Sequence, residues 1–203
     1  SKSFIKQWKY TAEKQPAGEP DVVKYKFTYT HPVNKLAVTC MVKGYPLYHA
    51  VEWVLHFTNG NTADSPLIEN VNTCNLSLQY SAKGNFNLHY SEGSHITRYD
   101  FHPRSVRLLP GETKQMSPEG GRSSQGDYLP FFNIESPAGQ GVVLSVGWTG
   151  TWQTTLKVEN ENTVTLAAGM KRMQTFLYPG EAIRTPSISL LFWEGKDRMD
   201  GHN

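Results

Sequence analysis

The sequence carries little charge and contains no long apolar run. Charged residues make up 19% of it, and 20 Lys and Arg against 18 Asp and Glu give a net charge of +2. Because no basic run stands out, we predict neither a nucleic-acid partner nor an anionic membrane partner. No apolar segment approaches the roughly 20 residues of a membrane-spanning helix. A weakly charged partner fits this composition best.

Cysteine is also scarce, since Cys40 and Cys74 are the only two in the sequence. Two cysteines do not form a disulfide scaffold, and these lack the spacing of a zinc site. Buried free thiols and one cross-strand disulfide both remain open. The pair does not fix the cellular compartment, for which we expect the periplasm or the exterior rather than the cytoplasm.

Motifs of several enzyme classes are missing. The seven histidines are scattered, with no His-x-x-x-His spacing, so we predict no metal site. Gly-x-Ser-x-Gly, the nucleophile turn of many hydrolases, is absent. Gly120-Gly121 is not followed by Lys-Ser/Thr, so no phosphate loop is predicted. We therefore expect no cofactor.

The sequence is rich in apolar and polar residues that alternate with a period of two. Aromatic residues make up 12% of it. This period, bounded by turn residues such as Asn59-Gly60-Asn61, predicts half-buried β-strands. We predict such strands near residues 24–31, 36–43, 51–58, 74–80, 142–148, 152–158, 164–168 and 188–192. No segment has a helical period over three turns, so the predicted fold is all-β, a large antiparallel two-sheet β-sandwich.

Two connections carry further information. The short Thr149-Gly150 break between residues 142–148 and 152–158 predicts a hairpin. Residues 117–127 are small and polar and predict a long surface loop, a place where binding residues are common. Because the strands on both sides of this loop are alike, residues 1–203 are interpreted as a single sandwich domain.

Glycosidases need two facing carboxylates about 5–10 Å apart. Glu52, Asp100, Asp127, Glu194 and Asp197 qualify by residue type, and the sequence alone pairs none of them. Glu52 lies within a predicted strand, where a solvated or ion-paired role is the simpler interpretation.

Trp148 and Trp152 flank the tight turn in Gly147-Trp148-Thr149-Gly150-Thr151-Trp152. An indole beside a turn can stack on the apolar face of a pyranose while polar neighbours bind its hydroxyls. The alternative is that both rings pack between the sheets, and the sequence leaves both interpretations open. Trp53 has apolar neighbours at two-residue spacing and is expected in the core.

Several ordered blocks resemble one known family. They are residues 51–59, Gly121-Arg122-Ser123-Ser124, residues 129–133, residues 147–152, and Leu177-Tyr178-Pro179-Gly180-Glu181 followed by Arg184-Thr185-Pro186. Together they resemble the N-terminal domain of the α-galactosidases of glycoside hydrolase family 36, the melibiase group. The resemblance implies a β-supersandwich, similar to that of galactose mutarotase, placed before a (β/α)₈ barrel.

In this family the catalytic aspartates lie on the barrel, which this sequence lacks, so the resemblance implies no catalytic residue here. It implies a domain that packs on the barrel and lends loop residues to the sugar pocket. The substrate-binding candidates are Arg122, Asp127, Tyr128, Trp148 and Trp152. The chain ends, Ser1-Lys2-Ser3-Phe4 and Asp200-Gly201-His202-Asn203, suggest a processed or engineered start and a natural chain that continues.

Three hypotheses follow. The first is a non-catalytic N-terminal domain of an α-galactosidase-like enzyme, whose partners are the missing barrel, a galactoside-like carbohydrate and further copies of itself in a homo-oligomer. The second is an autonomous carbohydrate-binding module with Trp148 and Trp152 as its stacking platform. The third is a small mutarotase- or lyase-type enzyme, which requires a His/Glu constellation in a groove. If a barrel covers part of the domain, we also expect an exposed apolar or aromatic patch.

Overall fold

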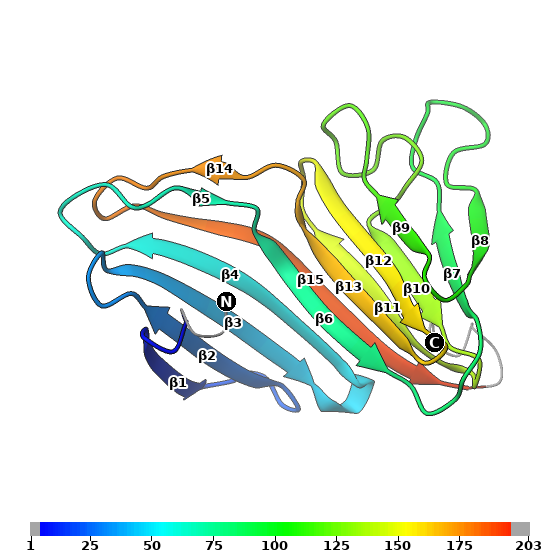
Figure 1. Cartoon of the computed structure of the whole chain (residues 1–203), viewed down its shortest axis with the longest axis horizontal. Helices are drawn as coiled ribbons and strands as arrows, with labels where there is room; N and C mark the ends of the chain where they lie inside the picture. The colour runs from blue at the N-terminus through cyan, green and yellow to red at the C-terminus, as the bar shows by residue number, and fades with distance from the viewer. Residues whose placement is uncertain (1–4, 196–203) are drawn as a thin grey trace.

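Antiparallel strands build the whole molecule in the computed structural model, which describes residues 5–195 (Figure 1). They form one nine-stranded sheet, one four-stranded sheet and a small two-stranded sheet. The prediction of an all-β sandwich is therefore confirmed. Ser1–Phe4, Asp197 and residues 200–203, on which some sequence predictions fell, lie outside the described residues.

The nine-stranded sheet runs in the order β1-β2-β3-β4-β15-β11-β10-β7-β8. In chain order its strands are β1 (Lys9–Gln15), β2 (Val23–Thr30), β3 (Leu36–Tyr45), β4 (Ala50–Asn59), β7 (Phe86–Ser91), β8 (Pro103–Leu108), β10 (Phe131–Glu135), β11 (Gln140–Gly147) and β15 (Ala182–Glu194). A short 3₁₀ turn, η1 (Pro46–Tyr48), joins β3 to β4.

The four-stranded sheet runs in the order β6-β13-β12-β9 and packs over one half of the large sheet (Figure 1). Its strands are β6 (Asn72–Gln79), β9 (Thr113–Met116), β12 (Trp152–Asn160) and β13 (Thr163–Met170). The two-stranded sheet pairs β5 (Ile68–Glu69) with β14 (Gln174–Thr175).

The main core lies between the two larger sheets and follows the period of two. In β11, Val142, Leu144 and Val146 are buried and face Trp152, Leu156 and other buried residues of the four-stranded sheet. A second, smaller core forms under the two-stranded sheet, where Phe57 and Leu36 pack with Ile68, Met173 and Leu177. Apolar alternation thus positions both layers.

The predicted hairpin between residues 142–148 and 152–158 is wrong. β11 pairs with β10 and β15 in the large sheet, whereas β12 pairs with β9 and β13 in the small one. The turn at residues 148–151 therefore carries the chain from one sheet to the other. The physical reason is that both strands have a buried apolar face, and these faces meet across the core instead of lying side by side.

Both cysteines are free, which decides between the two alternatives left open by the sequence. Cys40 lies half-buried in β3 of the large sheet, and Cys74 is fully buried in β6 of the small sheet. Glu52 in β4 forms an ion pair with Lys43 in β3, with 2.9 Å between Oε1 and Nζ, as its ion-paired interpretation predicted.

Candidate functional site

Two long loops meet at one end of the sandwich, next to the turn at residues 148–151. Residues 92–102 connect β7 to β8, and residues 117–130 connect β9 to β10 (Figure 1). The Ser94 amide donates to the Ser124 carbonyl over 2.7 Å, and the Gly126 amide donates to the Ser94 carbonyl over 3.2 Å. These bonds form a short parallel bridge between the loops. We call the two loops together with the turn 148–151 the rim.

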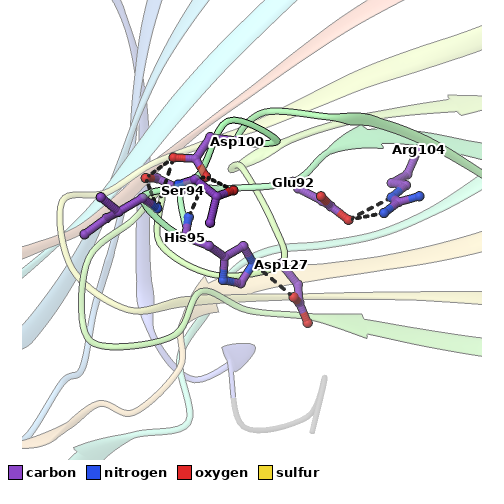
Figure 2. A network of polar contacts seen from close by, with 8 residues as sticks. Glu92, Ser94, His95, Asp100, Arg104 and Asp127 are labelled. Carbon is purple, nitrogen blue, oxygen red and sulfur yellow. Dashed lines mark hydrogen bonds and ion pairs between the residues drawn. The ribbon is translucent and has the colours of Figure 1, made fainter.

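Asp100 organises the first of these loops (Figure 2). Its carboxylate accepts hydrogen bonds from the Ser94 hydroxyl at 2.6 Å, the His95 amide at 2.9 Å and the Thr97 amide at 3.1 Å. The bond from Ser94, followed by those from His95 and Thr97, holds the pKa of Asp100 well below its ordinary value. Ile96 is presented at the loop tip with a positive φ of 61° and is 90% exposed. A β-branched residue in this conformation is uncommon and is retained only where its surroundings enforce it.

The second loop is bonded to the core by a tryptophan. Trp152 is fully buried at the start of β12, where its ring meets Phe132 edge-on at a centroid distance of 5.5 Å. Its Nε1 donates to the Ser123 carbonyl over 2.8 Å. Of the two interpretations that the sequence left open, packing between the sheets is therefore the correct one for Trp152, and its place among the sugar-binding candidates is wrong because its side chain is fully buried. Its role is to hold the loop in place.

Close backbone approach between the two loops requires glycine. A Cβ added to Gly93 would lie 2.5 Å from the Ser124 carbonyl oxygen, closer than side-chain carbons come to other atoms. Gly126 has a φ of +85°, and a Cβ there would meet the Glu119 side chain at 2.8 Å. Larger residues at either position would push the loops apart.

The largest hollow in this region lies between the second loop and the turn 148–151. It has a volume of about 670 Å³ and is lined by Pro118, Glu119, Gly120, Gly121, Trp148, Thr151, Met170, Lys171 and Arg172. We call it the rim hollow. Trp148 is half-buried in its wall, and the Arg184 guanidinium lies 5.8 Å from the centre of the indole. An aromatic ring, a carboxylate and two cations around a hollow of this size suit a polar ligand with an apolar face.

Arg122 and Asp127 lie on the other side of the same loop. Arg122 lines a smaller hollow of about 210 Å³ with His95, Ile96 and Glu119. Asp127 contacts His95, with 3.5 Å between Oδ1 and Nε2 (Figure 2). The structure thus brings these two predicted residues together around His95, whereas Trp148 lies in the rim hollow.

The Tyr128 side chain packs against neighbouring residues and does not project into a hollow of the rim. Its ring is half-buried against the main core, 5.2 Å from the ring of Tyr90, and Lys114 Nζ lies 5.7 Å from its centre. Tyr128 lines neither of the two hollows of the rim. At the base of the first loop, Arg104 bonds Glu92 through both Nε and Nη2, at 2.7 and 2.6 Å (Figure 2).

Three basic residues of the rim region were missed by the sequence-based prediction. Lys171 and Arg172 follow β13 directly, and Arg184 lies in β15 beside Trp148. The adjacent Lys-Arg pair at a strand end was the available signal, but only the fold shows that β13 ends beside the turn 148–151.

Within residues 5–195, no group of three or more His, Cys, Asp or Glu side chains is arranged so that it could hold a metal ion. The described part of the chain also holds no helix of the length and apolarity that a membrane crossing needs.

Comparison with known proteins identifies solved structures that share this fold. No family model and no curated relative matches the sequence. Among solved structures, an α-galactosidase from Lactobacillus brevis superposes with a TM-score of 0.74 at 16% identity, over 92% of this chain and 27% of that one. The family 36 α-galactosidase AgaA from Geobacillus stearothermophilus gives a TM-score of 0.68 at 15% identity, over 92% and 28%.

The same architecture occurs in an enzyme of different specificity. An α-N-acetylgalactosaminidase from Bifidobacterium bifidum matches with a TM-score of 0.54 at 10% identity, over 95% of this chain and 29% of that one. This chain spans about a quarter of the length of the enzymes it matches. It therefore has the fold of the N-terminal domain of family 36 α-galactosidases, as the resemblance predicted.

Proposed function

We propose that this chain is the non-catalytic N-terminal domain of an α-galactosidase-like glycoside hydrolase, which supports a catalytic barrel and shapes the entrance of its sugar pocket. One observation supports the proposed role in shaping the entrance of the sugar pocket. Loops from both sheets are bonded into one rim, and an open hollow with Trp148 in its wall lies beside them. Loops held on a rigid β scaffold are where binding residues concentrate.

The uncovered aromatic residues of β1 and β2 support the proposed contact with a catalytic barrel. Tyr25 and Tyr29 are each 37% exposed although they alternate as core residues do, and Tyr10, which is 50% exposed, pairs with Tyr29 in the neighbouring strand. Their exposure is what the sequence led us to expect of a domain that another part of the same polypeptide covers. Sugar complexes of a similar enzyme also fit, since variants of AgaA were solved with raffinose and with stachyose.

The test combines the intact mass of the native gene product with an assay on a chromogenic α-galactoside. We expect a longer, active product, and we expect no turnover by the 203-residue chain on its own. Turnover by that chain would refute the non-catalytic role. An inactive native product ending at Asn203 would refute the assignment to a galactosidase.

The rim hollow also favours the second candidate, an autonomous carbohydrate-binding module. The two-tryptophan platform does not exist, because Trp152 is buried, but the Trp148 ring with Arg184 and Lys171 can still bind a sugar. Stacking on one aromatic ring contributes about 0.5–1.5 kcal/mol beyond area burial. Trp148→Ala should therefore weaken sugar binding at the rim hollow severalfold, and an unchanged affinity would exclude the rim hollow as the binding site of such a module.

A His/Glu pair, which the mutarotase- or lyase-type hypothesis requires, is present in β7 and β10. His89 and Glu135, however, bond to each other, with 2.8 Å between Nε2 and Oε2. A carboxylate bonded to an imidazole orients that ring and is not a second group that faces the ring across a groove. This geometry favours the first two candidates over the third.

A further inference from the structure

A second hollow lies on the large sheet, on the face turned away from the four-stranded sheet. Its volume is about 370 Å³, and its lining includes His89, Ser105, Phe131 and Asn133. Ser105 pairs with His89 and His89 pairs with Asn133 across β8, β7 and β10, so the three side chains share one face. The residues that alternate with them, Leu88, Phe132 and Ile134, are buried between the sheets. We call this second space the outer hollow.

His89 is fixed by bonds to both of its ring nitrogens. Nε2 lies 2.8 Å from Glu135 Oε2, and Nδ1 lies 2.7 Å from Ser105 Oγ. Because an ionised carboxylate can only accept, Nε2 donates to Glu135, and Nδ1 shares a hydrogen bond with the Ser105 hydroxyl. Asn87 Nδ2 donates to the same Glu135 oxygen over 3.3 Å. The polar wall is thus held in one arrangement before any ligand arrives.

The charges around the outer hollow are paired. Among the described residues that line the hollow, Arg104 is the one with a permanent charge, and it binds Glu92 at 2.6 Å. A negatively charged ligand would have to compete with Glu92 for Arg104, whereas a neutral ligand would leave this ion pair intact. The electrostatics therefore favour a neutral molecule.

Asn133 supplies a donor that the protein does not use. The residue is only 4% exposed, and its Oδ1 accepts from Trp193 Nε1 over 2.9 Å, which fixes the orientation of the amide. Its Nδ2 has no hydrogen-bond partner among the described residues. A buried donor without a partner costs free energy, and a ligand oxygen at this wall would remove that cost.

Phe131 supplies an apolar surface beside these polar groups. It is 55% exposed at the start of β10, on the same face of the sheet as Asn133 two residues later. Pro103 also lines the hollow. An exposed ring next to fixed donors and acceptors matches a molecule with one apolar face and several hydroxyl groups.

We propose that the outer hollow is a binding site for a neutral pyranoside, with Phe131 against the apolar face of the ring and the Asn133 amide donating to a ligand oxygen. The volume lies within the range of about 300–1,000 Å³ of small-ligand sites. This site is separate from the rim hollow and depends on no catalytic role of the chain.

The test is a titration of the ¹⁵N-labelled chain with methyl α-D-galactopyranoside, followed by the backbone amide signals. Shifts at His89, Ser105 and Asn133 are expected, with weaker binding of galacturonic acid, which has a similar ring and a negative charge. Phe131→Ala should weaken binding about three- to tenfold. Phe176→Ala is the matched control, since Phe176 is 46% exposed directly after β14, outside the hollow.

Three results of these experiments would count against a binding site in the outer hollow. The absence of shifts, shifts confined to the rim hollow, or equal affinity of wild type and Phe131→Ala would each overturn the proposal. Trp148→Ala separates the two hollows, because it should leave the outer one unchanged. If Phe131→Ala does not fold, Ser105→Ala on the exposed edge strand β8 provides the same readout. The α-galactosidase assay has no bearing on this result.

Discussion

The two halves of the nine-stranded sheet share one sequence pattern and differ in burial. In β11, under the four-stranded sheet, Val142, Leu144 and Val146 are at most 2% exposed. In β2, beyond the edge of that sheet, Tyr25 and Tyr29 follow the same alternation and are each 37% exposed. The period of two therefore determines which face a residue occupies, while the packing of a second layer determines whether that face is buried.

Cross-strand pairing shows that the uncovered face is continuous with the core. Tyr25 pairs with Val42, Val42 with Trp53, and Trp53 with Ile188, which is fully buried. One row of side chains thus runs from an exposed tyrosine to the main core. The contribution of each side chain to the free energy of unfolding should therefore fall along this row, from Ile188 under the four-stranded sheet to Tyr25 beyond its edge.

The largest difference is expected between Trp152→Ala and Phe27→Ala. Trp152 is fully buried, and its removal should lower the free energy of unfolding by about 3–5 kcal/mol through lost burial and a cavity. Phe27 is half-buried in β2, and its removal should cost about 1 kcal/mol. Denaturant unfolding of both variants measures the two values, and similar losses would show that the two halves are equally packed.

The cysteines give a second contrast between covered and uncovered strands. Burial raises the pKa of the Cys74 thiol to about 12, and partial burial also raises the pKa of the Cys40 thiol. Since the thiolate is the nucleophile, the fully buried Cys74 should react with iodoacetamide at pH 8 much more slowly than Cys40. Mass spectrometry of the alkylated chain measures both rates. Equal rates would mean that the sheets separate readily.

Asp100→Asn should change the rim without changing either half of the sheet. Loss of the charged acceptor weakens the bonds from Ser94, His95 and Thr97, so tryptic cleavage after Arg98 should rise severalfold. Cleavage after Arg172, on the far side of the rim hollow, is the internal control. Equal acceleration at both sites would indicate global rather than local loosening.

The same carboxylate predicts a pH dependence. A lowered pKa in the folded state means that the stabilisation from Asp100 is fully present above the ordinary carboxyl pKa of about 3.9 and is lost as the pH falls below it. The amide proton shifts of His95 and Thr97 should therefore stay constant down to about pH 4, where an ordinary carboxyl group is half-protonated. A midpoint near pH 4 or above would contradict the role assigned to this group.

The smallest effect is expected from Lys43→Ala on the polar face of the uncovered half. The Lys43 and Glu52 side chains are 47% and 33% exposed, and exposed ion pairs contribute about 0–1 kcal/mol. A fall in the free energy of unfolding of less than about 0.5 kcal/mol is expected by urea denaturation. A loss as large as that of Phe27→Ala would show that electrostatics, not apolar contact, stabilises this half.

Much of the fold could be predicted from alternation, but the assignment of strands to sheets could not. The strands containing Tyr25, Val38 and Trp53 lie where the sequence predicted them. The turn at Thr149-Gly150 was interpreted as a hairpin because a short connection commonly joins strands of one sheet. Here β11 and β12 have their partners in different sheets, and those partners are distant in sequence, so local pattern carries no information about them.

Part of the candidate site could also be predicted from the sequence, and part could not. The sequence identified the second loop and Trp148, which lie at the rim. It treated Trp148 and Trp152 as equivalent, although one is half-buried at a hollow and the other is fully buried. Trp148 packs at the edge of the main core beside the rim hollow, whereas Trp152 lies inside that core. Lys171, Arg172 and Arg184 reach the same region from other strands, which only the fold reveals.

The bond from Trp152 to Ser123 divides the second loop into two parts with different tolerance to redesign. Ser123–Gly126 is bonded both to the core and to the first loop, so its length and backbone are constrained. A Cβ at Gly121 would meet no atom within 4 Å, although its φ of +81° still favours glycine. Residues inserted beside Gly121 would therefore extend the wall of the rim hollow while the core contacts stay intact. A protein engineer could exchange this segment to change the shape of the rim hollow without rebuilding the sandwich.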